Sequence, residues 1–105
     1  MLAISLLIQT QTCFAQTVDE QLKRAAAAID KNDLDSAMTD LNEVFKVESN
    51  NARAYDLRGI VYEAKQNFEL AIADDTKAIS LNPSEPRYYF NRGLAYAHKP
   101  SHDYR

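Results

Sequence analysis

Two histidines near the C-terminus, His98 and His102, are the side chains best suited to metal chemistry in this sequence. Two imidazoles four residues apart share one face of a helix and can bind zinc together, with Asp103 as a third ligand. Pro100 lies between them, however, and a proline inside a helix removes a backbone donor and bends or ends the helix. We therefore expect polar loop residues here, no metal site and no cofactor.

The other groups that could support catalysis lack partners in the sequence. Cys13 is the one cysteine among 105 residues, so it cannot by itself close an intrachain disulfide or form a cysteine-based metal site. No serine lies in a glycine-flanked elbow. Asp74 and Asp75 are neighbours on an expected helix, where their side chains diverge by about 100°, and we expect them on a solvated, charged face. The sequence thus predicts that the protein is not an enzyme.

The composition excludes further classes of function. Hydrophobic residues make up 46% of the chain and charged residues 26%, which fits one small folded domain. The chain has 12 Lys and Arg against 15 Asp and Glu, a net charge of -3, and its longest basic run is Lys23-Arg24. A protein that holds a nucleic-acid backbone needs a basic patch. Nucleic acid is therefore not an expected partner.

Residues 1–15 have features of a signal peptide. Residues 2–8 are apolar but far fewer than the roughly 20 residues of a membrane-spanning helix, so the mature chain is expected to have no membrane span. Cys13 and Ala15 place small residues three and one positions before a cut ahead of Gln16, which predicts an exported, periplasmic or secreted protein. No basic residue precedes the apolar run, so an upstream start codon or an uncleaved segment stays open. A lipid anchor at Cys13 is a further alternative.

The rest of the chain repeats with a period of 34 residues. Gly59 and Gly93, the two glycines, are 34 positions apart. A second shift by the same amount reaches Arg24, Lys31 and Asp40 from their equivalents in the central unit. Such a fixed period is typical of stacked repeats rather than of a closed globule. Five further identities share the offset: Arg53/Arg87, Tyr55/Tyr89, Arg58/Arg92, Tyr62/Tyr96 and Lys65/Lys99.

Within each period the spacing of apolar residues predicts two helices joined by a short polar turn. Thr17 followed by Glu20 predicts a capping box at the first helix, and Asn82-Pro83 predicts the end of the fourth. The fold class expected is all-α, an antiparallel helix-hairpin solenoid of about two and a half repeats after the N-terminal signal segment. The expected helices cover residues 18–31, 34–48, 52–65, 68–81 and 86–98.

This pattern resembles the tetratricopeptide repeat, a 34-residue hairpin with a bulky residue, Leu, Gly and Tyr in its first helix and Ala, an aromatic residue, Ala and Pro in its second. Residues 52–85 match it best, with departures at Arg58, where Leu is commoner, and at Asp75, where an aromatic residue is expected. The resemblance implies a degenerate repeat at 18–51, a second at 52–85 and an incomplete third at 86–105. The structural repeat positions, where helices pack closely, are then Ala25, Ala37, Tyr55, Gly59, Tyr62, Ala71, Ala78, Pro83, Tyr89, Gly93 and Tyr96.

In the family that this chain resembles, the first helices line a concave groove that binds a segment of a partner protein. The resemblance therefore implies a non-enzymatic protein–protein interaction module whose partner is another protein or peptide segment. The mixed apolar and charged character of the groove suits an amphipathic segment, unless its apolar residues pack against further repeats. The groove positions correspond here to Leu22, Ala26, Arg53, Asp56, Ile60, Glu63, Arg87, Phe90 and Leu94.

Two further implications follow from the resemblance. Chaperone-binding members of the family grip a C-terminal carboxylate with Lys, Asn, Lys and Arg, but the matching positions here hold Leu22, Ala26, Arg87 and Asn91, so acidic C-terminal tails are not expected ligands. Because the third unit shows only its first helix clearly, the alternative to a finished five-helix domain is an N-terminal or fragmentary structural segment of a larger exported repeat protein.

Overall fold

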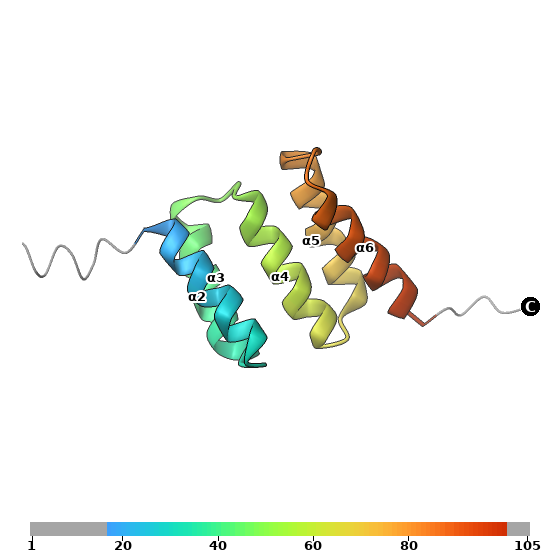
Figure 1. Ribbon diagram of the computed structural model, residues 1–105, viewed down its shortest axis with the longest axis horizontal. Coiled ribbons are helices and arrows are strands. Elements are labelled where there is room, and N and C mark those ends of the chain that lie inside the picture. The colour runs from blue at the N-terminus through green and yellow to red at the C-terminus, as the bar shows by residue number, and fades with distance from the viewer. Residues whose placement is uncertain (1–16, 101–105) are drawn as a thin grey trace, which may run out of the picture.

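The computed structural model describes residues 17–100, which form five α-helices joined by short loops (Figure 1). No strand occurs in this part of the chain. The all-α prediction is confirmed, and every expected helix boundary lies within one residue of the observed one. Residues 1–16 and 101–105, including the expected signal segment, lie outside the described residues. The helices are α2 (Val18–Asp30), α3 (Leu34–Val47), α4 (Ala52–Ala64), α5 (Phe68–Leu81) and α6 (Pro86–His98).

Side-chain caps fix the first helix of each unit at equivalent positions. Thr17 and Glu20 form the predicted capping box: the Glu20 amide donates to Thr17 Oγ1 at 3.1 Å, and the Thr17 amide donates to Glu20 Oε1 at 3.2 Å. Asn51 caps α4 by accepting from the Ala54 amide at 2.8 Å. Glu85 caps α6. The three caps are 34 residues apart, and each satisfies backbone donors that a helix start leaves open.

The turn inside each hairpin also repeats in its backbone geometry. Asn32 and Gln66, again 34 residues apart, have φ of 61° and 65°. In both turns the next residue closes a hydrogen bond back into the preceding helix, Asp33 N to Ala28 O at 2.7 Å and Asn67 N to Tyr62 O at 2.8 Å. This left-handed C-terminal geometry satisfies orphan carbonyls and reverses the chain within three residues. Each pair of helices is therefore held antiparallel.

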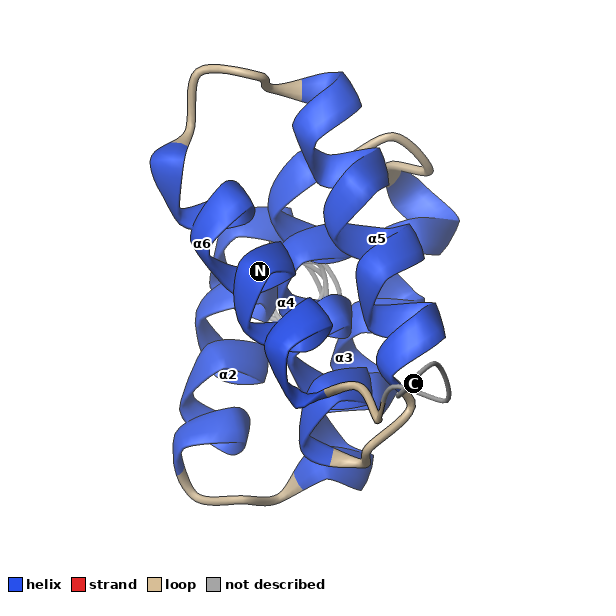
Figure 2. Cartoon of the chain, turned by 90° about the vertical axis from the view of Figure 1, so that its right-hand side faces the viewer, coloured by secondary structure: helices blue, strands red, loops and turns tan. Residues whose placement is uncertain are grey.

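The helices form two layers. The hairpins α2–α3 and α4–α5, followed by α6, stand side by side in chain order (Figure 1). Viewed along this stack, α2, α4 and α6 lie in one layer and α3 and α5 in the other (Figure 2). We call the layer of α2, α4 and α6 the first-helix layer. Successive helices pack on one another, and α4 also packs on α2 and α6, as in a helical solenoid.

The main hydrophobic core lies between α2, α3 and α4. Ala25 and Ala37 are completely buried, and their small side chains let α2 and α3 approach closely. Leu41 and Val44 from α3 reach across to α4, so the core joins the first hairpin to the second. The buried cluster consists of Leu22, Ala25, Ala37, Leu41, Val44, Ala54, Leu57 and Val61.

An ion pair links the two helices of each hairpin. The Arg58 guanidinium donates to both carboxylate oxygens of Asp74, at 2.8 and 2.9 Å, and also lies 4.6 Å from the centre of the Phe45 ring. Arg24 and Asp40, the equivalent residues of the first hairpin, are 3.7 Å apart. Arg58 stands where the family pattern favours Leu, and its pairing with Asp74 explains that departure.

The expectation that Asp74 and Asp75 lie on a solvated face is wrong. Their exposed fractions are 6% and 1%. Both residues face α4, because the side chains of α5 that point toward its hairpin partner include this pair as well as Ala71 and Ala78. Asp74 is neutralised by Arg58, whereas Asp75 lies beside a cavity described below.

The repeat positions of the third unit differ from those of the second. Gly59 is buried against Ala71 and Asp75 of α5, but a Cβ added at Gly93 would meet no atom within 4 Å among the described residues. Tyr89 and Tyr96 are exposed on the same helix. The close helix contact expected around Gly93 is thus absent from residues 17–100, because no described helix covers this side of α6.

Candidate functional site

The residues predicted to line a groove all belong to the first-helix layer, but they differ widely in exposure. Their burial decides which of them a partner could touch. Leu22 and Asp56 are buried. Ala26, Arg53, Ile60 and Glu63 are half-buried, and Arg87, Phe90 and Leu94 are exposed.

Leu22 is unsuited to partner binding. Its side chain belongs to the buried core with Ala25 and Leu41, and Ala26 packs partly against the same core. The structure therefore corrects the prediction at Leu22: spacing along α2 placed it among the groove positions, but the helix is rotated so that it points at α3 and α4. What remains accessible in the layer lies mainly on α4 and α6.

Two large apolar side chains are exposed on α6. Phe90 is 65% and Leu94 37% exposed, and they lie four residues apart, so they share one face of the helix. Leu94 and the half-buried Ile60 of α4 line the same cavity. An apolar strip therefore crosses from α6 to α4.

This cavity, which we call the α4–α6 cavity, has a volume of about 130 Å³. Its walls come from three helices, with Asp75 contributed by α5 from the other layer. A space of this size holds a few water molecules or one small chemical group. The lining residues are Gly59, Ile60, Glu63, Asp75, Asn91 and Leu94.

Asp56 is a buried carboxylate next to this cavity. Asn91 Nδ2 donates to Asp56 Oδ1 at 2.7 Å and joins α6 to α4. Burial raises the pKa of Asp56 above its usual value, while the Asn91 hydrogen bond and the charges of Arg87 and Arg53 oppose that rise. Asp56 is thus a bonded structural group rather than a free acid.

Asp75 is the unusual group of the site. It is 1% exposed, and its Oδ1 has no hydrogen-bond partner. Burial raises the pKa of Asp75 to about 7; the charges of Asp56 and Asp74 add to the rise and that of Arg92 opposes it. The carboxyl is therefore shared between its two protonation states near neutral pH.

Sequence reasoning noted Asp75 only as a departure from the family pattern. The signal that could have found it is the residue 34 positions earlier, Leu41, which is completely buried. A carboxylate at a repeat position that holds a core leucine in the neighbouring unit indicates a buried charge. Helical periodicity alone gave no such indication, because it treats every acidic residue as a surface residue.

His98 is engaged by a carboxylate. Its Nδ1 makes a short contact with Glu63 Oε1, and its ring lies 6.5 Å from that of Phe68. His102 and Asp103, the other members of the zinc pattern weighed from the sequence, lie outside the described residues. Between residues 17 and 100 no group of three or more His, Cys, Asp or Glu side chains is placed to hold a metal ion. No helix of this region is both long and apolar enough to cross a membrane.

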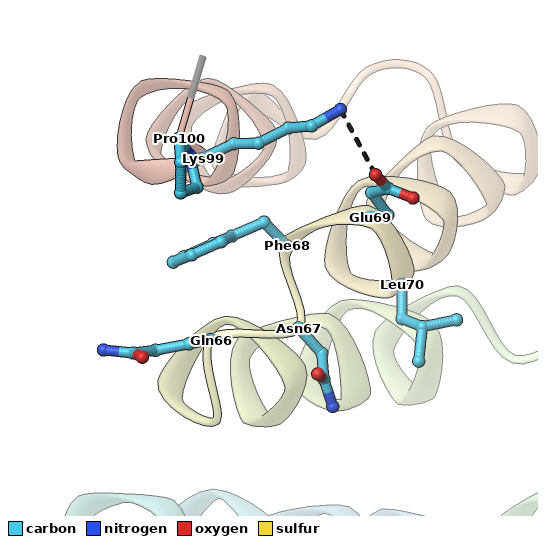
Figure 3. Close-up of a pocket in the computed structure, with 7 residues that line it drawn as sticks. All are labelled: Gln66, Asn67, Phe68, Glu69, Leu70, Lys99 and Pro100. Atoms are coloured by element: carbon cyan, nitrogen blue, oxygen red, sulfur yellow. Dashed lines mark ion pairs between the residues drawn. The ribbon is translucent and has the colours of Figure 1, made fainter. Parts of the chain in front are cut away.

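A second cavity, of about 370 Å³, lies where the α4–α5 turn meets the end of α6. Figure 3 shows the Phe68 ring between Gln66 and Pro100, with the Leu70 side chain on the far side of the turn. Lys99 Nζ lies 3.7 Å from Glu69 Oε1 across its edge. None of its lining residues is a predicted groove position, and it borders the undescribed residues after 100. We assign it no function.

Comparison with known proteins gives consistent matches. The family model for the tetratricopeptide repeat matches residues 52–85. Tetratricopeptide repeat protein 28 of Mus musculus is 30% identical over 83 residues, which are 79% of this chain and 3% of that protein. The Homo sapiens protein of the same name matches with the same identity and coverage. The chain thus spans only about 3% of the length of these relatives.

Proposed function

Because this chain is a tetratricopeptide repeat protein, we propose that it is a non-enzymatic module that binds a segment of another protein along the first-helix layer. Repeats of this family serve in protein–protein interaction. The observation that carries the proposal is the exposure of Phe90 and Leu94 on α6, beside the half-buried Ile60 of α4. Large apolar side chains gathered across two helices are typical of an interaction surface.

The charges around the apolar strip favour an amphipathic partner segment. Arg87 is exposed one helical turn before Phe90, and Glu63 lines the α4–α6 cavity beside Leu94. A segment that places apolar side chains on Phe90 and Leu94 would meet a positive group at one end of the strip and a negative group near the other. Such a polar rim fixes orientation, while the apolar centre supplies most of the affinity.

Peptide selection against the intact chain tests this proposal. Peptides that bind should lose about tenfold or more in affinity when Phe90→Ala removes the ring, since an interface centre is sensitive to truncation. Val47→Ala is the matched control, because Val47 is 71% exposed on α3, in the other layer. Peptides that are indifferent to Phe90→Ala but sensitive to Val47→Ala would contradict the proposal.

A structural role inside a longer repeat array is the second candidate. Tyr89, Arg92 and Tyr96 on α6 repeat the residues Tyr55, Arg58 and Tyr62 of α4, and Tyr89 and Tyr96 are exposed. A further helix packed on this side would bury them as α5 buries its side of α4. Tyr96→Ala should leave the melting temperature of this chain unchanged but lower that of a longer product of the same gene.

Export is part of the proposal. Its support is the apolar run of residues 2–8 followed by small residues before Gln16. The mature module would then act in the periplasm, in the cell envelope or outside the cell.

A further inference from the structure

The α4–α6 cavity exists because a carboxylate replaces a large apolar residue. Leu41 fills the equivalent position of the first hairpin and is completely buried. Asp75 is shorter and polar, and its Oδ1 is buried at the cavity without a hydrogen-bond partner. A buried acceptor left unpaired costs folding free energy. An unpaired oxygen beside an unfilled space points to a group that arrives from outside.

The neighbours of Asp75 hold this oxygen in place. The missing side chain of Gly59 makes the room, because a Cβ there would collide with Asp75 Oδ1. The nearest cation among the charges that act on Asp75, Arg92, donates instead to Thr76 Oγ1 at 3.2 Å. Asp75 therefore has no cationic partner of its own, in contrast to Asp74, which binds Arg58.

The charges that face the cavity are mostly negative. Asp75 and Glu63 line it, and Asp56 lies close enough to raise the pKa of Asp75. An anionic ligand would be repelled. A divalent metal needs six or more oxygen ligands or a tighter set of carboxylates, which this cavity does not offer. A single positive group fits both the charge and the volume.

We propose that the α4–α6 cavity binds the ammonium group of a lysine side chain from the partner segment, with Asp75 Oδ1 as acceptor. The inference rests on the proposed function, since it names the residue that the partner inserts. Ile60 and Leu94 form apolar walls for the methylene stem, while the charged head reaches Asp75 and Glu63. A compact ammonium suits about 130 Å³ better than a planar guanidinium, which is larger and binds as a fork.

Titration of the full chain with n-butylammonium chloride, followed by amide chemical shifts in two-dimensional NMR, tests the site directly. Shifts should concentrate at Gly59, Asp75 and Leu94 and should saturate. The uncharged isostere 1-butanol should bind about tenfold more weakly or not at all, because it lacks the charge-assisted hydrogen bond.

Two variants separate the site from general acidity. Asp75→Asn should weaken n-butylammonium binding about tenfold or more, and Asp75→Leu, which restores the side chain of position 41, should abolish it and keep the fold. Glu69→Gln is the matched control, because the Glu69 side chain is 82% exposed and far from the cavity lining. Binding that survives Asp75→Leu, or that falls equally with Glu69→Gln, would overturn the proposal.

The selected peptides distinguish this inference from the proposed function. Peptides that depend on Phe90 should contain a lysine whose replacement by norleucine costs about tenfold in affinity. Peptides that depend on Phe90 but tolerate norleucine would overturn the lysine site and leave the proposed function standing.

Discussion

At the scale of single residues, Asp75 makes stability depend on pH. Its pKa is raised from the ordinary value of 3.8 to about 7 in the folded chain, by burial first and then by Asp56 and Asp74. Between these two values the folded state binds more protons than the unfolded state, so stability falls as pH rises and is lowest above pH 7. We expect the melting temperature at pH 5 to exceed that at pH 8 by several degrees.

Thermal melts of wild type and Asp75→Asn between pH 4.5 and 8.5 check this prediction. The variant should melt higher than wild type at pH 8 and should show a much flatter profile, with the residual slope set by Asp56, whose pKa is also raised. Parallel profiles for the two proteins would show that Asp75 is fully ionised in the fold.

The two glycines provide a matched pair of substitutions. From the sequence, Gly59→Ala is expected to be tolerated or even stabilising, because Ala has the higher helix propensity by about 1 kcal/mol. The structure reverses this expectation: a Cβ at Gly59 would collide with Asp75 Oδ1 and lie 3.3 Å from the Ala71 carbonyl oxygen. We expect Gly59→Ala to destabilise by about 1–3 kcal/mol.

Gly93→Ala is the control, since a Cβ there meets nothing within 4 Å among the described residues. It should stabilise by up to about 1 kcal/mol. Urea denaturation of the three proteins measures both effects. Equal free energies of unfolding for the two variants would mean that Gly59 is not the close contact of the central hairpin.

At the scale of helices, the ion pair between α4 and α5 is predicted to be the strongest polar link within a hairpin. Arg58→Met leaves Asp74 buried without its guanidinium and should cost about 3 kcal/mol. Arg24→Met should cost only about 0–1 kcal/mol, because the Arg24 side chain is 58% exposed and lies 3.7 Å from Asp40. Chemical denaturation distinguishes these values, and a similar loss in both variants would show that burial of the central pair is unimportant.

The helices themselves could be predicted because their determinants are local. Apolar spacing, the Thr17–Glu20 capping box and the 34-residue period fixed type, number and ends. Side-chain roles that depend on a neighbouring helix could not be predicted in this way. Asp75 was assigned to the surface because aspartate is polar, and Gly93 to a close contact because it repeats Gly59. Each depends on whether another helix covers that face, which no window of a single helix reveals.

The candidate site shows the same division. Spacing placed Phe90, Leu94 and Ile60 in the first-helix layer, where the structure has them. Leu22 shared their register, but the terminal hairpin has no preceding repeat in the described chain, and Leu22 contributes to its core. The cavity behind Ile60 and Leu94 was invisible to spacing, because it depends on a residue of α5.

At the scale of the whole molecule, the mature chain is predicted to begin at Gln16. The apolar run of residues 2–8 and the small residues at Cys13 and Ala15 are the basis of this prediction. Intact-mass spectrometry of protein purified from an expressing bacterium checks it: the expected mass is that of residues 16–105. A soluble product that keeps Met1 would contradict both the cleavage and the proposed export.

The charge of the molecule also predicts what the first-helix layer does not bind. The chain carries a net charge of -3, and three carboxylates, from Asp56, Glu63 and Asp75, lie at or beside the α4–α6 cavity. Asn91, one of the positions that would grip a carboxylate in chaperone-binding relatives, already donates its amide to Asp56. A C-terminal carboxylate brought to this surface would lose hydration without gaining cationic donors beyond Arg87.

We therefore expect no measurable affinity for a peptide that ends in Glu-Glu-Val-Asp, tested by isothermal titration calorimetry at low salt, where attraction between opposite charges would be strongest. The control is a peptide of the same length in which lysines replace the glutamates, because the site favours positive groups and this peptide should bind more tightly. Raising the ionic strength should weaken the lysine peptide, since exposed charge contacts are screened at about 10 Å in 0.1 M salt. Micromolar binding of the acidic peptide would show that Arg87 and Arg53, rather than the carboxylates of the cavity, dominate the field of this layer.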